Sequence, residues 1–330
     1  MSTPDASIAA SAADRCATFS WLRLALGTLL GVAAVWAAFE AAHFYPLSVA
    51  PDEPVPVTAP PLPTSPVDVS LSFVETGVAP TIGNHVVQGL GLTRVPVTFR
   101  AALIRHPSGT LLFGTGISAQ HNERHVGFKV GTPFGASQPG TAVGDALRSV
   151  RIDRVILPTM RWYNLGGIWS LDAATPILVG SGELSTALGR SWPWRFGYDP
   201  DWSRELESRI QGVSLGAGGT LGGRKSEDLF GDGSVVAVAY KGSSLEEIAL
   251  LVTLGSGKRV LLVGDSVLHE EQVTQVRLTY QAMSWFQDRN RMQAVGVTQR
   301  LSAVQATLGI DVIPMLDGTQ QLPRYPESWR

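Results

Sequence analysis

The chain has 330 residues, of which 44% are hydrophobic and 16% charged, and its formal net charge is −2. A net charge so close to zero gives no reason to expect nucleic acid as a partner, which normally requires a clustered basic face, and the single cysteine, Cys16, excludes an intrachain disulfide. The length suffices for one apolar segment and one globular domain of about 200–260 residues.

The amino-terminal part is an apolar segment between polar flanks. Residues 1–20 are rich in Ala and Ser, and we expect them to form a disordered cytoplasmic tail. In residues 21–41 no charge occurs between Leu24 and Phe39. A helix of about 18 apolar residues crosses the core of a bilayer, so this segment is predicted to be a transmembrane signal anchor.

The charges on the two sides of this segment predict its orientation. Arg15 and Arg23 lie at or before its start, whereas Glu40 and Asp52 follow it. By the positive-inside rule the globular part lies outside the cytoplasm, in the periplasm or at the cell surface. A cleaved signal peptide and a buried core helix are the alternatives. The long leader without a clean A-x-A site disfavours the first, and the proline-rich tract that follows disfavours the second.

Residues 42–66 form this proline-rich linker, with eight prolines between Pro46 and Pro66. The composition favours extended polyproline II, so the linker is predicted to act as a semi-rigid spacer between the membrane and the domain. A proline-rich recognition motif is the alternative.

Residues 67–330 have the pattern of one globular domain. A hairpin comes first, with a turn from His106 to Gly109, and strands then alternate with helices, which is typical of two sheets with helices outside. The expected strands are Val97–Ile104, Thr110–Phe113, Val155–Leu157, Pro176–Val179, Val235–Ala239, Ile248–Leu254, Val260–Val263 and Val312–Ile313. The expected helices are Thr141–Val150, Gly182–Leu188, Glu270–Arg291 and Thr298–Leu308.

Five segments of this domain, in order, resemble the metallo-β-lactamase superfamily. They are ALIRHPSGTLLFGTG from Ala102, IDRVILPTMRWYNLGGI from Ile152, SVVAVAYKGSSLEEIALLV from Ser234, RVLLVGDSV from Arg259 and VIPMLDG from Val312. The resemblance covers about residues 73–323 and implies an αββα sandwich of two mixed β-sheets flanked by helices, within the α/β (α+β) class. It also implies a metal-dependent hydrolase, with zinc as the expected cofactor.

The positions at which the family carries its metal ligands hold other residues here. Where the family has its His-x-His-x-Asp-His signature, this chain has Thr159, Arg161, Tyr163 and Asn164. The later two histidine positions hold Ser243 and Leu316, and the Asp of the first hairpin is Gly114. Of the expected ligands only Asp265 is kept.

This replacement argues against a metal centre. Zinc needs at least three imidazole, thiolate or carboxylate ligands, and a permanent cation such as Arg161 repels a metal ion. No metal or other cofactor is therefore expected. We expect Arg161 to pair with Asp265 across the old metal cavity, with Tyr163, Asn164 and Ser243 completing the hydrogen-bond network. The alternative is that Arg161 points into solvent.

Other patterns carry less information. His121 and His125, with Glu123 between them, have the spacing of a helical metal-binding pair but no obvious third ligand. The glycine-rich stretch from Gly216 to Gly223 lacks a phosphate-binding ending and is expected to be a connection.

Tryptophans gather near the mouth of the expected site. Trp162, Trp169, Trp192 and Trp194, with Trp202 further on, are candidates to line a ligand pocket, and packing in the core is the alternative.

The function predicted from these observations is that of a membrane-anchored, exported pseudoenzyme that binds or scaffolds an unknown protein or small molecule. The alternatives are a hydrolase of an ester, lactone or β-lactam that uses a non-standard site, and a structural subunit of an envelope complex. Enzymatic activity is thus uncertain, and no catalytic residue is assigned.

Overall fold

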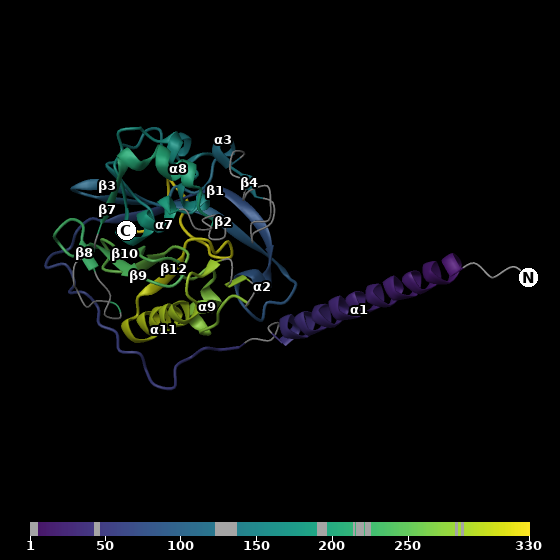
Figure 1. Ribbon diagram of the computed structural model, residues 1–330. Coiled ribbons are helices and arrows are strands. Elements are labelled where there is room, and N and C mark those ends of the chain that lie inside the picture. Colours follow the sequence, from purple (N-terminus) through teal and green to yellow (C-terminus); the bar gives the residue numbers. More distant parts are fainter. Residues whose placement is uncertain are drawn as a thin grey trace, which may run out of the picture.

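The computed structural model describes residues 6–42, 47–122, 137–189, 197–213, 215, 221, 226–280, 283–284 and 287–330. Its first element, α1 (Ala6–Ala42), is a 37-residue helix that projects away from the rest of the molecule (Figure 1). Within it, Trp21–Ala38 is long and apolar enough to cross a membrane, and none of that stretch is buried. The disorder expected for residues 1–20 is contradicted from Ala6 onward, because the Ala-rich sequence continues the helix.

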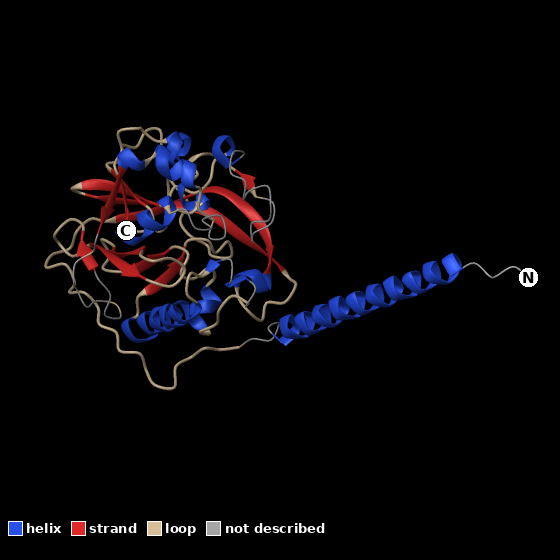
Figure 2. Cartoon of the chain, in the orientation of Figure 1, coloured by secondary structure: helices blue, strands red, loops and turns tan. Residues whose placement is uncertain are grey.

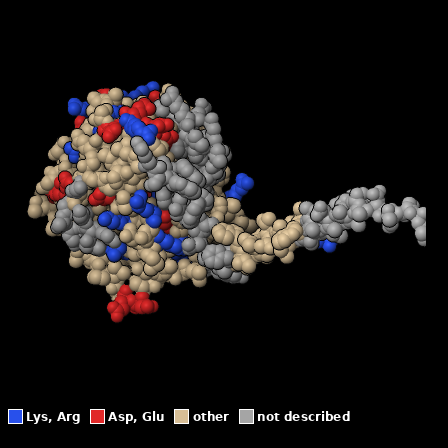
Figure 3. Space-filling view, viewed as in Figure 1, with Lys and Arg blue, Asp and Glu red and all other residues tan. Residues whose placement is uncertain are grey.

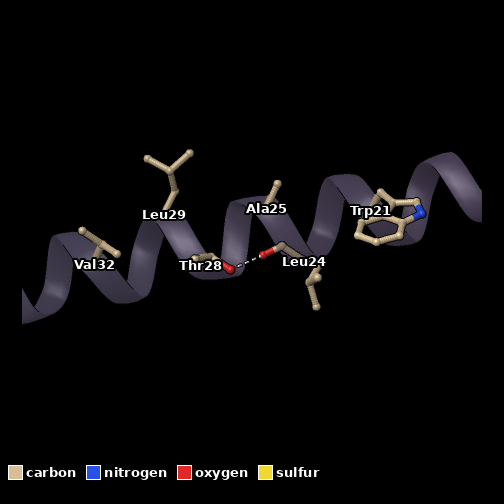
Figure 4. A pocket seen from close by; sticks show the side chains of 6 residues that line it. All are labelled: Trp21, Leu24, Ala25, Thr28, Leu29 and Val32. Atoms are coloured by element: carbon tan, nitrogen blue, oxygen red, sulfur yellow. Dashed lines mark hydrogen bonds between the residues drawn. The ribbon is translucent and has the colours of Figure 1, made fainter.

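One face of α1 carries a shallow apolar groove, shown in Figure 4 and lined by Trp21, Leu24, Ala25, Thr28, Leu29 and Val32. The polar member of this set, Thr28, donates its hydroxyl to the carbonyl of Leu24 at 2.9 Å. Because the hydroxyl is satisfied within the helix, it does not oppose the helix lying in hydrocarbon.

The domain contains two sheets. The seven-stranded sheet has the order β4-β1-β2-β3-β5-β6-β7. Its strands are β1 (Ser70–Ile82), β2 (Arg94–His106), β3 (Gly109–Phe113), β4 (Gln138–Pro139), β5 (Arg154–Ile156), β6 (Ile177–Gly180) and β7 (Ile210–Val213). The β2–β3 hairpin turns between His106 and Gly109, as predicted, and β3, β5, β6 and β7 run parallel.

The five-stranded sheet has the order β12-β11-β10-β9-β8. Its strands are β8 (Ser226–Asp228), β9 (Val235–Tyr240), β10 (Glu247–Thr253), β11 (Arg259–Val263) and β12 (Asp311–Pro314). Strands β8 to β11 are antiparallel, and β12 is parallel to β11.

The helices lie on the outer faces of the two sheets (Figure 2). They are α2 (Gly83–Val86), α3 (Ala119–Asn122), α5 (Val143–Ala146), α6 (Trp162–Leu165), α7 (Ser181–Leu188), α8 (Pro200–Glu205), α9 (Glu270–Thr274) and α11 (Arg291–Leu308), with 3-10 turns at Ile168–Ser170 and Glu207–Arg209. One apolar cluster fills the space between the sheets, a second lies under α5, α6 and α8, and a third lies under α11. The αββα sandwich predicted from the sequence is confirmed.

Three predicted helices differ in the structure, and one of them, Thr298–Leu308, begins earlier, at Arg291. The segment Thr141–Val150 forms only the single turn of α5. The segment Glu270–Arg291 is broken, because α9 ends at Thr274 and Val276 adopts a positive φ of 49°. Beyond it the backbone carbonyls serve other partners: that of Leu278 accepts from the amide of Gln88, at 2.8 Å.

The proline-rich tract is extended, as expected, but it does not stand free of the domain. We call residues 47–63 the strap. Its backbone is held at three points: the Val49 amide donates to the Val276 carbonyl (2.7 Å), the Thr58 carbonyl accepts from the Leu221 amide (2.7 Å), and the Pro60 carbonyl accepts from Arg259 (3.1 Å). Val57 and Ala59 pack against the outer apolar cluster of the five-stranded sheet. The strap is therefore part of the cover of this sheet, which corrects the prediction of a spacer.

Candidate functional site

The candidate site lies where β5 and β11 end side by side. After β5, the Pro158 carbonyl accepts a hydrogen bond from the Ile248 amide of β10 at 3.1 Å. After β11, Gly264 approaches Pro158 so closely that a Cβ at Gly264 would lie 2.4 Å from the Pro158 Cβ. This close approach, which only glycine permits, brings Asp265 against Thr159.

Asp265 accepts hydrogen bonds from two neighbours on the loop after β5. The Thr159 hydroxyl donates to Oδ2 at 2.5 Å, and the Asn164 side-chain amide lies 3.2 Å from both carboxylate oxygens. The same Asn164 amide donates to the Thr159 oxygen at 2.8 Å. The carboxylate is thus held by uncharged donors and still needs a counter-charge, because its side chain has no exposure to solvent.

Arg161 supplies that charge. Its Nη1 lies 3.3 Å from Asp265 Oδ2, and the side-chain exposures of the two residues are 1% and 0%. Nη1 also donates to the Tyr163 hydroxyl at 3.1 Å, and Nη2 donates to the carbonyls of Ser243 (2.8 Å) and Gln287 (2.5 Å). Burial acts to lower the pKa of Arg161, but Tyr163 and Asp265 act in the opposite direction and outweigh it, so the pKa is raised. The guanidinium is therefore charged and does not point into solvent.

The other sequence-predicted positions complete this site or its walls. Tyr163 and Asn164 belong to the short helix α6, which is buried throughout. The Ser243 hydroxyl faces away from Arg161 and donates to Glu247 at 2.6 Å, so it is the backbone of Ser243 that serves the guanidinium. Leu316 is 2% exposed and belongs to the apolar cluster that contains Trp162.

The glycines of the loop shape its two ends. Gly114 adopts a positive φ of 68°, and a Cβ there would lie 4.0 Å from Asn164 Oδ1, so this position adjoins the site without a side chain of its own. At the far end, a Cβ on Gly167 would lie 2.2 Å from the Thr115 carbonyl oxygen. The glycine pair therefore lets the loop pack against the end of the hairpin.

Two buried carboxyl groups, Glu183 and Glu247, and the half-buried Asp288 lie near the pair, and the sequence did not single them out. Glu247 accepts from the hydroxyls of Ser243 (2.6 Å) and Ser266 (2.7 Å), and burial together with the nearby Asp265 raises its pKa to about 7. Burial also raises the pKa of Glu183, whose Oε1 accepts from the Met160 amide at 2.8 Å, and that of Asp288. The available signal was weak: Glu247 starts an otherwise apolar strand, and a carboxyl in a strand buried on both faces needs partners.

The site is closed to solvent. The side chains that build it belong to residues that are 5% exposed or less, namely Thr159, Arg161, Tyr163, Asn164, Ser243, Glu247 and Asp265. Charges in such surroundings are screened little by water, so the ion pair and each hydrogen bond of this site are stronger than similar interactions at the protein surface.

The donor set does not fit a zinc ion. Both oxygens of Asp265 are already engaged, and a guanidinium nitrogen lies 3.3 Å from one of them. Hydroxyl and amide groups are weak zinc ligands, and a fixed positive charge opposes a metal cation. Among the described residues, no group of three or more His, Cys, Asp and Glu side chains is arranged to hold a metal.

Of the tryptophans proposed to line a pocket, Trp162 lies in the core, and Trp169 packs nearer the surface against Trp202. Trp162 is 2% exposed and lies 5.5 Å, ring to ring, from Phe99, so it is part of the core. Trp169 packs edge-on against Trp202 at 4.8 Å and donates to Glu205 at 2.8 Å. Trp192 and Trp194 lie outside the described residues, as do His125, Glu123, the His121 side chain and most of Gly216–Gly223.

A surface hollow of about 660 Å³ lies at the opposite end of β5 from the Arg161 loop. It is lined by the residues before β5 and before β6, among them Arg148, Arg151, Asp153 and Asp172. Arg151 and Asp153 pair with each other at 3.0 Å. The hollow is therefore separate from the site at the ends of β5 and β11.

Comparison with known proteins places the fold. No protein-family model and no curated protein matches the chain. Among solved structures, it is similar to an N-acyl homoserine lactone hydrolase with N-hexanoyl-L-homoserine bound at its catalytic metal centre, with a TM-score of 0.62 and 16% identity over 80% of this chain and 100% of the other. It is also similar to the dizinc quorum-quenching lactonase AidC (TM-score 0.55, 8% identity, 81% and 95% coverage). A third match is AbOPH, a hydrolase of the β-lactamase superfamily (TM-score 0.51, 12% identity, 83% and 93% coverage).

Proposed function

This chain has the fold of the metallo-β-lactamase superfamily hydrolases, and from that premise we propose that it is a membrane-attached protein that binds or scaffolds a partner and does not carry out metal-dependent hydrolysis. The observation that carries the proposal is the buried pair of Arg161 and Asp265. It occupies the positions at which the family resemblance implies a metal centre. The chain has a helix that suits attachment to a membrane, and the globular domain is proposed to lie outside the cytoplasm.

The geometry supports binding over catalysis for a physical reason. A hydrolytic site needs a nucleophile that reaches the substrate and a group that stabilises the developing charge. Here the two terminal nitrogens of Arg161 are engaged by the oxygens of Asp265, Tyr163, Ser243 and Gln287, and its Nε has no hydrogen-bond partner. The side chain is only 1% exposed, so a substrate in solvent does not reach the guanidinium.

The test is metal analysis of the full-length protein, purified in mild detergent after expression in zinc-supplemented medium. We expect substoichiometric zinc, iron and manganese by mass spectrometry, no shift of the thermal midpoint on adding these ions, and no opening of N-hexanoyl homoserine lactone. A metal-loaded lactonase of the same fold serves as the positive control. Stoichiometric, tightly held metal together with lactone turnover would overturn the proposal.

The alternative is a hydrolase that uses a non-standard site, and it has one observation in its favour beyond the hydrolases of the same fold. The Ser243 hydroxyl donates to Glu247 at 2.6 Å, and the pKa of Glu247 is raised to about 7, close to the range in which a general base works. Both residues are 2% exposed or less, which keeps a substrate away from them. Metal-independent turnover of a 4-nitrophenyl ester that disappears in Ser243→Ala and persists in the control Ser256→Ala would establish this alternative.

A further inference from the structure

The strap determines how far the domain can lie from the membrane. The helix α1 ends at Ala42, and Ser48 already pairs with Arg277 of the domain. Six residue steps separate these two positions, and an extended chain covers at most about 3.6 Å per step, or roughly 22 Å in all. A domain of this size is about twice as wide as that distance. The face around Arg277 must therefore remain close to any bilayer that holds α1.

The segment 276–280 is the centre of that face. The Val276 carbonyl receives the strap through the Val49 amide, and the Leu278 carbonyl receives the Gln88 amide that follows α2. The Thr279 carbonyl accepts from Arg291 at the start of α11, at 3.4 Å. Figure 1 shows α2, α9 and the beginning of α11 on the side of the domain that is nearest to α1.

Apolar side chains that are unusually exposed border this segment. In the described part of the chain outside α1, the large hydrophobic residues that are exposed are Leu47 (53%), Leu62 (61%), Val78 (38%), Leu92 (70%) and Met292 (77%). Leu47 begins the strap, Leu92 lies on the loop between α2 and β2, and Met292 lies in the first turn of α11. Three of the five thus surround segment 276–280. The loop of Leu92 is held in place because Asn84 accepts from the amides of Gly89 (3.0 Å) and Gly91 (2.8 Å).

Basic residues accompany these apolar ones. Arg94, two residues after Leu92, and Arg289, three residues before Met292, are exposed, and Arg291, next to Met292, is half-buried. Glu271 is bound to Arg277 at 3.3 Å, so its charge is largely balanced. In Figure 3, several basic side chains lie on the part of the domain next to α1. The exposed carboxyl groups of Asp52, Glu53 and Glu270 lie in the same segments, so it is the exposed apolar side chains next to arginines, and not a net positive charge, that suit this face to the interface of a bilayer.

We propose that the face formed by Leu47, Leu92, Met292 and the neighbouring arginines rests on the phospholipid surface, so that the domain lies flat on the membrane. The inference rests on the membrane attachment proposed above and adds an orientation to it. The candidate site lies just behind this face, because Arg161 donates to the Gln287 carbonyl and the Arg289 amide donates to the Ser243 carbonyl (3.3 Å). A partner that binds at the edge of the candidate site would therefore bind close to the membrane surface.

The test uses the full chain, with Cys16→Ser as background, in vesicles of phosphatidylcholine with a minority of phosphatidylglycerol. A fluorophore is placed in turn at Leu92→Cys, Met292→Cys and Ser108→Cys, and nitroxide-labelled lipids quench it. Ser108 is the matched control: it is exposed at the far end of β2, whose 13 residues separate it from Leu92 by roughly 40 Å.

We expect a large loss of fluorescence at positions 92 and 292 and little at 108. Equal quenching at all three positions, or none at 92 and 292 while the protein floats with the vesicles, overturns the membrane-facing orientation and leaves the attachment intact. Failure of the protein to float with the vesicles overturns the attachment itself and the orientation with it. Neither result depends on the metal and lactone measurements, so this inference and the proposed absence of metal chemistry fail separately.

Discussion

The ion pair of Arg161 and Asp265 gives the most direct prediction about the candidate site. Arg161→Met keeps the length of the side chain and removes its charge and donors. It leaves the Asp265 carboxylate buried without a counter-charge and removes the Arg161 donors from the carbonyls of Ser243 and Gln287, of which Ser243 keeps the Arg289 amide. Removing one partner of a buried pair costs about 3–5 kcal/mol, and we expect this variant at the upper end of that range.

Asp265→Asn removes the opposite charge and should cost less. Thr159 can still donate to the Asn oxygen, and Arg161 keeps the oxygens of Tyr163, Ser243 and Gln287. We expect about 3 kcal/mol for this change. In the double variant no buried charge is left unpaired, so its loss should fall short of the sum of the two single losses by about 2 kcal/mol.

The assay is urea unfolding of the full chain in mild detergent, followed by tryptophan fluorescence, with all four proteins compared at one pH. The matched control is the exposed pair of Lys258 and Asp311, which is shorter at 2.8 Å but has side chains that are 46% and 51% exposed. Lys258→Met and Asp311→Asn should each cost at most about 1 kcal/mol. Additive losses at Arg161 and Asp265, within about 0.5 kcal/mol, would refute the coupling derived from their geometry.

Three further changes test other parts of the structure. The pKa of Glu247 is raised in the folded protein to about 7, so the folded state binds the proton more tightly than the unfolded state. The stability of the protein should therefore fall as the pH rises from about 4.5 to 7. The thermal midpoint of Glu247→Gln should lack this part of the decline, and parallel pH profiles of the two proteins would contradict the assignment. Val57→Asp places a charge on the side of the strap that packs against the sheet and should lower the thermal midpoint by roughly 5–10 °C. The control Thr58→Asp, on the exposed side of the strap, should change the midpoint little. Equal midpoints for these two variants would mean that the strap does not cover the sheet. Gly167→Ala forces a Cβ against the Thr115 carbonyl and should cost about 2 kcal/mol or more in urea unfolding, and a wild-type midpoint would show that the loop can relax.

The sequence was sufficient for eight of the twelve described strands, because these are short apolar runs bounded by turn residues, and β9, β10 and β11 begin and end within two residues of their predicted limits. Strands β1, β4, β7 and β8 were not predicted. The sequence was insufficient wherever a backbone group forms a hydrogen bond with a residue that is distant along the chain. The predicted helix Glu270–Arg291 failed for that reason, since the Val276 carbonyl binds the strap and the Leu278 carbonyl binds the Gln88 amide. Proline content likewise predicts an extended strap but contains no signal for the surface on which it lies.

The candidate site shows the same division. The loop residues Thr159, Arg161 and Asn164 were identifiable because they stand in a recognisable frame between β5 and the glycine pair. The buried carboxyl groups of Glu183 and Glu247 were not identifiable, because the sequence around a single Glu does not show whether its side chain is buried or exposed to solvent. Only the assembled structure shows that Arg161 lies near several carboxyl groups whose pKa values are raised by burial.

Stability alone does not account for an ion pair at this position. Replacing a buried pair with well-packed apolar side chains is often neutral or stabilising, and another position singled out by the family resemblance, Leu316, is packed in an apolar cluster. What hydrocarbon cannot do is connect specific backbone groups. Arg161 joins its own loop to the carbonyl of Ser243 after β9 and to that of Gln287 before α11, and through Asp265 to the end of β11. The guanidinium fork therefore connects the loops that follow β5, β9 and β11 with the segment before α11, a connection that an apolar side chain would not make.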